Sequence, residues 1–499
     1  MTAPRARRLG GGLLLIAALL GAWLGADRSR RALIKTFFVD GAVAGSAPAW
    51  PIATAPGIAP IERVRVVLLD GLSAAHADTL PRLAEICSKG QVLDVDVGFP
   101  TVSLPVQHVL WTGLTQQQSG LQYHIGKLAS PPPHAIPAAI DSVAVAESHP
   151  EIVHSFGFTA ARPPLPDPAA TPENPDPAVL AWPGIFPSAA TAAIAGSSRL
   201  AFVHVLRIDD AGHKTGGASP EYAAAATWSD ELLATLWSAA PADARTRWFI
   251  LADHGHRPAG GHGDAEPEIR HVRACVVGGV DPGTERGVHL IDVARAIADS
   301  LGLALDPAAR ARPWSAALGA PAADATLPTT SLPRGLIAAV LALCGLLCLI
   351  PVHAQRRGDL LLAVALGLAW PLLAACTLTV LHSAPTLSNP VVFPPQGRDM
   401  LVAAGPAMAV LGLLTALAAW RRWSAPRIAA VALLPWFAVT LAALVLARVP
   451  DLLIHGLPPL TPGFTAWTSV LLAQGRLACL VLAVLLGVVL IVRTLRSPR

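Results

Sequence analysis

The stretch Arg63–Asp70, RVRVVLLD, decides the fold of the polar part of this sequence. Valine and leucine dominate it, and it ends in Asp70 followed by Gly71. This is the pattern of a strand buried on both faces of a parallel sheet. Open α/β sheets bind ligands at the carboxyl ends of such strands. We therefore expect Asp70 to lie at a ligand-binding edge.

Three more runs with the same pattern of a buried parallel strand follow along the chain: Leu200–Arg207, Arg247–Ala252 and His271–Val277. Stretches of helical pattern separate them, for example Glu221–Trp237. Strands that alternate with helices are typical of α/β domains. The sequence therefore predicts an α/β sandwich with a central, mostly parallel sheet.

The composition indicates that part of the chain is much more apolar than a soluble domain. Of the 499 residues, 53 % are hydrophobic and 14 % are charged, whereas soluble domains carry about 25 % charged residues. Residues 9–26 are uncharged and follow three arginines, so they form a signal peptide ending near Ala26 or an uncleaved anchor; their length favours an anchor. The net charge of +4 gives no reason to expect nucleic-acid binding.

The C-terminal third is again apolar. Five runs are long enough to cross a bilayer as helices, at about 335–353, 360–381, 400–420, 428–447 and 471–492. We expect an N-terminal anchor at 1–26, a catalytic domain at 27–319, a Pro/Ala/Thr linker at 320–333, and a polytopic transmembrane region at 334–499. The protein is thus expected to be integral to a membrane.

Arginines between the apolar runs predict the orientation. They cluster in alternate loops and at the C-terminus, at Arg356, Arg357, Arg421, Arg422, Arg427, Arg493, Arg496 and Arg499. By the positive-inside rule these segments are cytoplasmic. The catalytic domain then lies on the extracytoplasmic side, which is periplasmic in a bacterial inner membrane. The basic residues at 28–35 oppose this orientation.

Ionisable side chains follow the predicted strands. The first strand ends in Asp70, the second is followed by Asp209 and His213, and the third by Asp253, His254 and then His262. Parallel strands bring these residues to one edge of the sheet. Imidazole and carboxylate ligands suit Zn²⁺, with Mn²⁺ or another divalent ion as the lesser alternative. Six ligands are too many for one tetrahedral zinc and predict two divalent metal ions.

Thr101 supplies a candidate nucleophile. It lies in FPTVSLP, residues 99–105, after an apolar stretch and before a helical pattern. The N-terminus of a helix favours a bound anion. Coordination to a metal can activate a threonine hydroxyl, which is otherwise a poor nucleophile.

Three motifs resemble the alkaline phosphatase superfamily, and in particular its nucleotide pyrophosphatase/phosphodiesterase and GPI ethanolamine phosphate transferase branches. They are FPTVSLPVQHVLWTGL at 99–114, DDAGHKTG at 209–216, and ADHGH with GGHG at 252–263. The resemblance covers roughly residues 64–305. The transferase branch also combines an N-terminal span, a lumenal catalytic domain and a multi-span C-terminal region, as this chain does.

The resemblance implies a role for each site residue. Asp209, His213 and His262 would hold one metal ion. The other would be held by Asp70, Asp253, His254 and the Thr101 oxygen. Thr101 would form a covalent phospho-threonine.

The chain departs from the family at two places. The asparagine that holds a phosphate oxygen in the phosphodiesterases is missing, and Gln122 or His124 lies near its place. His256 replaces a common methionine. It could support a metal ligand from behind, but we favour the interpretation as an ordinary loop histidine. We interpret His204 as structural or exposed. Cys87 and Cys275 could pair outside the cytoplasm, but the sequence favours free thiols.

The sequence therefore predicts a membrane-anchored, two-metal phosphodiesterase or head-group transferase that acts on a membrane lipid or another phosphodiester. Hydrolysis of soluble nucleotide-type phosphodiesters is the first alternative. A non-catalytic membrane assembly factor with a degenerate domain is the second. A sulfatase is disfavoured because FPTVSLP does not supply the modifiable Cys or Ser motif of that branch.

Overall fold

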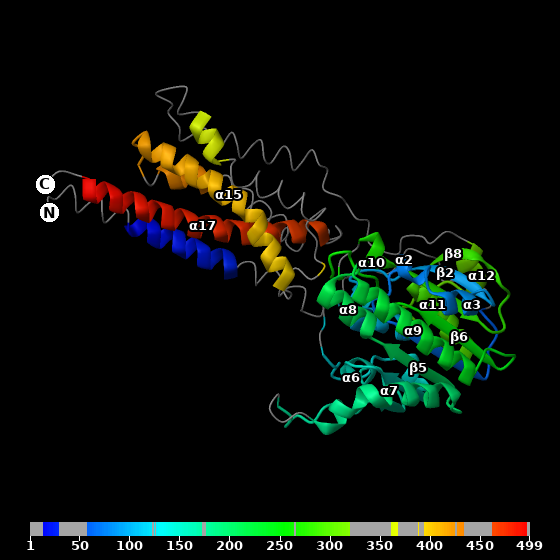
Figure 1. Cartoon of the computed structure of the whole chain (residues 1–499). Coiled ribbons are helices and arrows are strands. Elements are labelled where there is room, and N and C mark those ends of the chain that lie inside the picture. Colours follow the sequence, from blue (N-terminus) through cyan, green and yellow to red (C-terminus); the bar gives the residue numbers. More distant parts are fainter. Residues whose placement is uncertain are drawn as a thin grey trace. The chain divides into compact units, whose positions relative to one another are not determined.

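The computed structural model describes residues 13–28, 57–121, 124, 126–171, 176–263, 266–319, 361–367, 388, 394–424, 427–433 and 462–496. The chain divides into two compact units, one covering Phe37–Pro328 and the other covering Met1–Thr36 together with Thr329–Arg499. Each unit is described by itself (Figure 1). The predicted linker at 320–333 lies outside the described residues.

The first unit alternates strands with helices. Its described elements are β1 (Arg63–Leu69), α2 (Ala74–Ala77), α3 (Pro81–Cys87), β2 (Gln91–Asp96), α4 (Ser103–Thr112), α5 (Gln116–Ser119), η2 (Ile136–Ala139), β3 (Ser142–Ala146), α6 (Pro150–Val153), β4 (Ala160–Arg162), α7 (Pro177–Ala195), β5 (Leu200–Val205), α8 (Arg207–Thr215), α9 (Pro220–Ala239), β6 (Thr246–Leu251), α10 (Pro267–Arg270), β7 (His271–Val277), β8 (Gly283–His289), α11 (Leu290–Leu301) and α12 (Trp314–Gly319).

The described strands form one eight-stranded sheet in the order β4-β3-β5-β1-β6-β7-β2-β8. β1 lies near its middle and pairs in parallel with β5 and β6. The mostly parallel α/β sheet is therefore confirmed. The prediction that His271–Val277 is a parallel strand is wrong, because β7 runs antiparallel to both β6 and β2. A buried apolar run fits either direction, so its composition could not reveal this.

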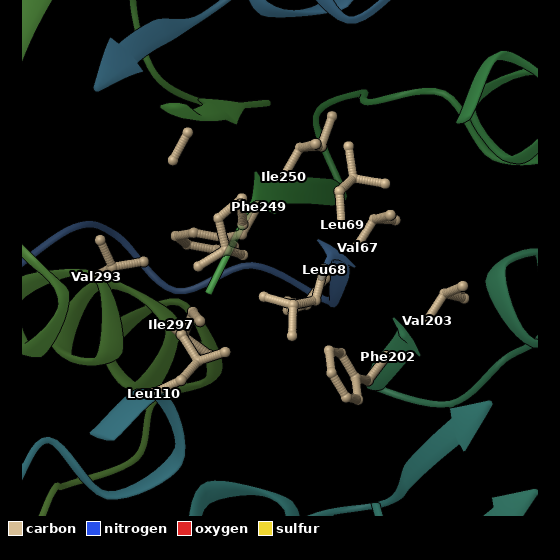
Figure 2. Close-up of a cluster of buried hydrophobic side chains, with 14 of the residues drawn as sticks. Val67, Leu68, Leu69, Leu110, Phe202, Val203, Phe249, Ile250, Val293 and Ile297 are labelled. Carbon is tan, nitrogen blue, oxygen red and sulfur yellow. The ribbon is translucent and has the colours of Figure 1, made fainter. Parts of the chain in front are cut away.

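Helices pack on both faces of the sheet. On one face, Leu110 of α4 and Val293 and Ile297 of α11 meet Leu68, Phe202 and Phe249, whereas Val67, Leu69, Val203 and Ile250 point to the other (Figure 2). This alternation follows from the two-residue period of a strand. Because both faces are covered, β1, β5 and β6 are mostly apolar, as parallel strands buried on both faces are.

A disulfide joins Cys87 at the end of α3 to Cys275 on β7. The expectation of free thiols was wrong. The two residues are 188 positions apart in sequence, so nothing in their spacing could show that α3 lies against β7. Disulfides of this kind persist in oxidising compartments.

The second unit contains a helix over 13–28, α15 (Pro394–Trp420) and α17 (Pro462–Arg496). Arg476 of α17 donates a hydrogen bond to Asp27 at 2.5 Å, and its guanidinium lies over the Trp23 ring. The helix over 13–28 is therefore tied to α17 at this end.

Two described helical stretches are long and apolar enough to cross a membrane, Pro177–Ala195 and Gly475–Val492. The first is α7, whose Trp182 donates to the Ala146 carbonyl oxygen at 2.9 Å and whose Phe186 is buried against the sheet. It therefore covers the sheet of the first unit. Of the predicted spans, 335–353 lies outside the described residues, and only 361–367 and 427–433 of two others are described, as helix.

Candidate metal centre and nucleophile

Asp70, Asp253 and His254 converge at the carboxyl ends of β1 and β6. All three side chains are fully buried. One potential ligand atom from each lies within 4.8 Å of the other two. The backbone N–H groups of Gly71 and His254 donate to Asp253 Oδ1 at 3.1 and 3.0 Å. The other oxygen, Asp253 Oδ2, and Asp70 Oδ1 are buried without a hydrogen-bond partner among the described residues.

The pKa values of Asp70 and Asp253 are both raised above the usual range of a carboxyl group. Burial raises the pKa of Asp70 well above its usual range, and the charge of Asp253 raises it further. Burial, followed by the charge of Asp209, raises the pKa of Asp253 to about 7. Adjacent buried carboxylates with unpaired oxygens are costly unless a cation faces them. This donor set therefore fits a divalent metal ion.

A second group joins Asp209, His213 and His262. Asp209 lies in the first turn of α8 and His213 one turn later, with Nε2 3.3 Å from Asp209 Oδ2. The loop after β6 brings His262 Nε2 to 3.0 Å from His213 Nε2. Burial would raise the pKa of Asp209, but hydrogen bonds from His213 and His256 outweigh it, and the pKa lies well below its usual range.

Backbone carbonyls determine the tautomers of His254 and His262. His254 Nδ1 lies 3.1 Å from the Gly255 carbonyl oxygen, and His262 Nδ1 lies 2.7 Å from that of Thr101. A carbonyl only accepts, so each Nδ1 carries the hydrogen. Burial keeps both rings neutral, because it lowers the pKa of His254 to about 3 and that of His262 well below its usual value. Both rings therefore present an Nε2 lone pair, as metal ligands do.

Thr101 lies at the start of α4, fully buried. The Gly263 N–H donates to its hydroxyl oxygen at 2.9 Å. The loop before it is held by Gln116, whose side-chain amide donates to the carbonyl oxygens of Val97 and Pro100 at 2.9 and 3.2 Å. The same segment at 262–263 thus contacts Thr101 through both His262 and Gly263. Ser103 offers a second hydroxyl, 3.3 Å from His254 Nε2.

Gly71 allows the two groups to lie close together. It has a φ of +74°, and a Cβ there would fall 2.8 Å from the Asp209 Cα atom. The Asp209 N–H also donates to the Asp70 carbonyl oxygen at 3.1 Å. The glycine that follows the first strand is therefore a packing requirement of the site.

Two histidines at the site were not identified from sequence. His204 of β5 lies 2.6 Å from Asp70 Oδ2 through its Nε2 and is fully buried. His256 lies 2.7 Å from Asp209 Oδ1 through its Nε2. The interpretation of His256 as an ordinary loop residue was wrong, because its side chain is 0 % exposed. His204 could have been found from its place five residues before Asp209 on a buried strand. Gln122 lies outside the described residues, and His124 is partly buried.

Comparison with known families gives a direct match. Residues 157–266 match the model of the type I phosphodiesterase / nucleotide pyrophosphatase family. This segment of the chain therefore resembles that family, which is part of the alkaline phosphatase superfamily. The matched segment contains Asp209, His213, Asp253, His254 and His262 but not Asp70 or Thr101. No curated protein matches the chain.

Several solved structures also match part of this chain. They include an inactive variant of murine ectonucleotide pyrophosphatase/phosphodiesterase 5 in complex with AMP, at 14 % identity over 51 % of this chain and 98 % of that one, with a TM-score of 0.39. A protein of the alkaline phosphatase superfamily from Vibrio parahaemolyticus matches at 14 % identity over 60 % and 79 %, with a TM-score of 0.37. A sulfatase from Bacteroides thetaiotaomicron matches at 14 % over 54 % and 76 %, with a TM-score of 0.38.

The family match and the site agree on the coarse activity. The match is to a phosphodiesterase family, and the two buried His/Asp clusters suit two metal ions, as in a phosphodiesterase-like, metal-dependent hydrolase. The clusters share His254, since one joins Asp209, His254, His256 and His262 and the other joins Asp70, Asp253 and His254.

Proposed function

We propose that the chain is a membrane-anchored phosphodiesterase or head-group transferase that uses Thr101 as its nucleophile and two zinc ions as cofactors. One observation carries the proposal. The buried Thr101 hydroxyl lies just before the first turn of α4, and the segment that contacts it at 262–263 also supplies His262, whose Nε2 carries a lone pair. Nucleophile and metal centre are therefore held together.

In the proposed reaction, the substrate phosphoryl group binds between the two His/Asp clusters and the first turn of α4. Two divalent ions in such a site stabilise the charge on the phosphoryl oxygens and activate a hydroxyl. The N-terminus of α4 favours the same negative charge. Positioning and charge compensation are what phosphoryl transfer requires.

The Thr101 hydroxyl oxygen then attacks phosphorus, the bond to the leaving oxygen breaks, and the departing alkoxide takes up the proton that Thr101 gives up. A covalent phospho-threonine remains, and its phosphorus still carries the second ester group of the substrate. Water or an acceptor hydroxyl next attacks this phosphorus and releases Thr101. Water makes the enzyme a phosphodiesterase, and an acceptor hydroxyl makes it a transferase.

Three observations support a membrane lipid as substrate and an extracytoplasmic catalytic domain. Gly475–Val492 is long and apolar enough to span a bilayer. The Asp27–Arg476 hydrogen bond ties the helix over 13–28 to the same α17, which favours a retained anchor over a cleaved signal peptide. The Cys87–Cys275 disulfide suits an oxidising compartment. An enzyme that acts on a soluble substrate would not need a membrane-spanning helix.

The nucleophile is tested by trapping the phospho-enzyme. The full-length protein in detergent is mixed with bis-p-nitrophenyl phosphate, quenched in acid, and its peptides are examined by mass spectrometry. We expect a p-nitrophenyl phosphoryl group on Thr101 in the wild type, none in Thr101→Ala, and partial activity in Thr101→Ser, which keeps a hydroxyl. Ser103→Ala is the matched control and should still be labelled. The same group on Ser103, or full activity of Thr101→Ala, would contradict the assignment.

The substrate class is tested separately with the same preparations. Release of the head group from labelled phosphatidylethanolamine, lost in Thr101→Ala, would support the lipid proposal. Activity only on a nucleotide diester would favour the soluble alternative. Wild-type protein that holds no metal and cleaves neither substrate would contradict the enzymatic proposal.

A further inference from the structure

His256 lies where a metal ligand could lie. Atoms of Asp209, His254, His256 and His262 that could bind a metal all fall within 4.8 Å of one another. The ring is fully buried, with its Nε2 2.7 Å from Asp209 Oδ1. It could therefore ligate the ion beside Asp209, or it could hold Asp209 without touching the ion.

The backbone distinguishes these roles. The Gly261 N–H donates to His256 Nδ1 at 3.2 Å. An amide N–H can only donate, so this Nδ1 carries a lone pair and the hydrogen of the neutral ring lies on Nε2. That nitrogen must then donate to Asp209 Oδ1 and has no lone pair for a metal ion. His254 and His262 have carbonyl oxygens at Nδ1 and therefore the opposite tautomer.

Gly212 leaves room for the ring. A Cβ atom at this position of α8 would lie 2.5 Å from His256 Cδ2 and 2.6 Å from its Nε2, and each of the three nearest atoms that it would meet belongs to His256. Without His256, an alanine at 212 would meet none of these atoms. The glycine between Asp209 and His213 is thus matched to the histidine across from it.

We propose that His256 is a positioning residue, a fixed Nε2–H donor that orients the Asp209 carboxylate toward its metal ion, and that Gly212 is required to seat its ring. The proposal rests on the two-metal site proposed above. Partners of this kind, which hydrogen-bond a metal ligand and fix its direction, typically change metal affinity about 10- to 100-fold when removed.

The test compares two side chains of similar length at 256. Gln keeps an N–H donor, and Met fills the space without one. Zinc content at saturation and zinc affinity, by competition with a chromophoric chelator, are measured on the full-length protein in detergent. We expect all three proteins to hold two zinc ions. The affinity of the site that contains Asp209 should stay within about threefold of wild type in His256→Gln, and it should fall about 10- to 100-fold in His256→Met.

Gly212 provides an independent arm. Gly212→Ala alone should weaken zinc binding as His256→Met does, because the ring is displaced. In the double variant Gly212→Ala/His256→Ala the alanine at 212 should add nothing to the loss caused by His256→Ala. Additive losses would show that the ring and the glycine are not matched, and would overturn that part of the proposal.

The remaining outcomes separate this inference from the proposed function. If His256→Gln and His256→Met both hold one zinc ion, His256 is a ligand and the inference is wrong. If both bind zinc like the wild type, His256 does not position Asp209. If the wild type itself binds no zinc, the two-metal proposal fails and the inference fails with it.

Discussion

The two halves of the metal centre differ in how far the protein alone balances their charge. The strand-end half, Asp70, Asp253 and His254, is fully buried and has two carboxylate oxygens without described partners. The helix half, Asp209, His213 and His262, is 9 to 20 % exposed, and histidines surround its single carboxylate. The pKa values of Asp70 and Asp253 are accordingly raised, whereas that of Asp209 is lowered.

The difference follows from where the ligands originate. Strand ends buried by helices on both faces bring carboxylates together away from solvent. The first turn of α8 instead places Asp209 where the helix dipole favours an anion. The strand-end half is therefore the part that most needs a cation, and the helix half is already partly compensated.

The largest expected effect comes from removing one carboxylate from either half. Asp70→Asn and Asp209→Asn should each lower the rate of bis-p-nitrophenyl phosphate cleavage about a thousandfold, because a catalytic metal supplies several kcal/mol of transition-state stabilisation. Each variant should lose one zinc ion and keep the other, measured by elemental analysis. Loss of both ions from either variant would show that the halves do not bind independently.

A substitution outside both halves should act on stability alone. Replacing Cys87 and Cys275 together by alanine removes the disulfide and should lower the free energy of unfolding by about 2 to 5 kcal/mol. Urea denaturation of the full-length protein in detergent measures it. Zinc content and activity per folded molecule should stay at wild-type values. A loss of zinc in this double variant would mean that the disulfide also shapes the site.

A further effect on stability concerns pH and the metal-free protein. Since burial raises the pKa of Asp253 to about 7, the folded state holds this proton more tightly than the unfolded state, whose carboxyl group titrates near 3.9. The resulting stability is fully present below pH 3.9 and is lost as pH rises to about 7. The loss is about 1.4 kcal/mol per pH unit in this window.

Asp253→Asn should remove this dependence. Its amide oxygen can accept from Gly71 and His254 as before, and its NH₂ group can donate to the unpartnered Asp70 Oδ1. The chelated variant should therefore be more stable than chelated wild type at pH 8, and the difference should shrink toward pH 4. Asp209→Asn is the matched control and should not gain stability at pH 8, because the pKa of Asp209 is lowered.

Much of this arrangement can be predicted from sequence, because the end of a strand can be recognised from a short stretch of neighbouring residues. The run Arg63–Asp70 and the residues that follow two later strands predict that Asp70, Asp209 and Asp253 lie at one edge, and the structure brings them together. His254 and His262 follow by the same reasoning. The roles of these residues as ligands stay predictions.

What could not be predicted depends on contacts between distant segments. The antiparallel direction of β7, the Cys87–Cys275 pairing and the approach of His256 to Gly212 all join residues whose proximity no local pattern encodes. The sequence correctly places His204 on a strand. Its contact with Asp70 could not be predicted, because Asp70 follows a different strand. The tautomers depend on individual backbone groups such as the Gly261 N–H.

The most direct test of the central claim is to locate the metal ions in the zinc-loaded full-length protein by anomalous X-ray scattering. We expect two peaks about 4 Å apart, one beside Asp70, Asp253 and His254 and the other beside Asp209, His213 and His262. Thr101 should lie next to the first peak, and His256 should touch neither. A single peak, or a peak bound by His256, would show that the two-metal assignment is wrong.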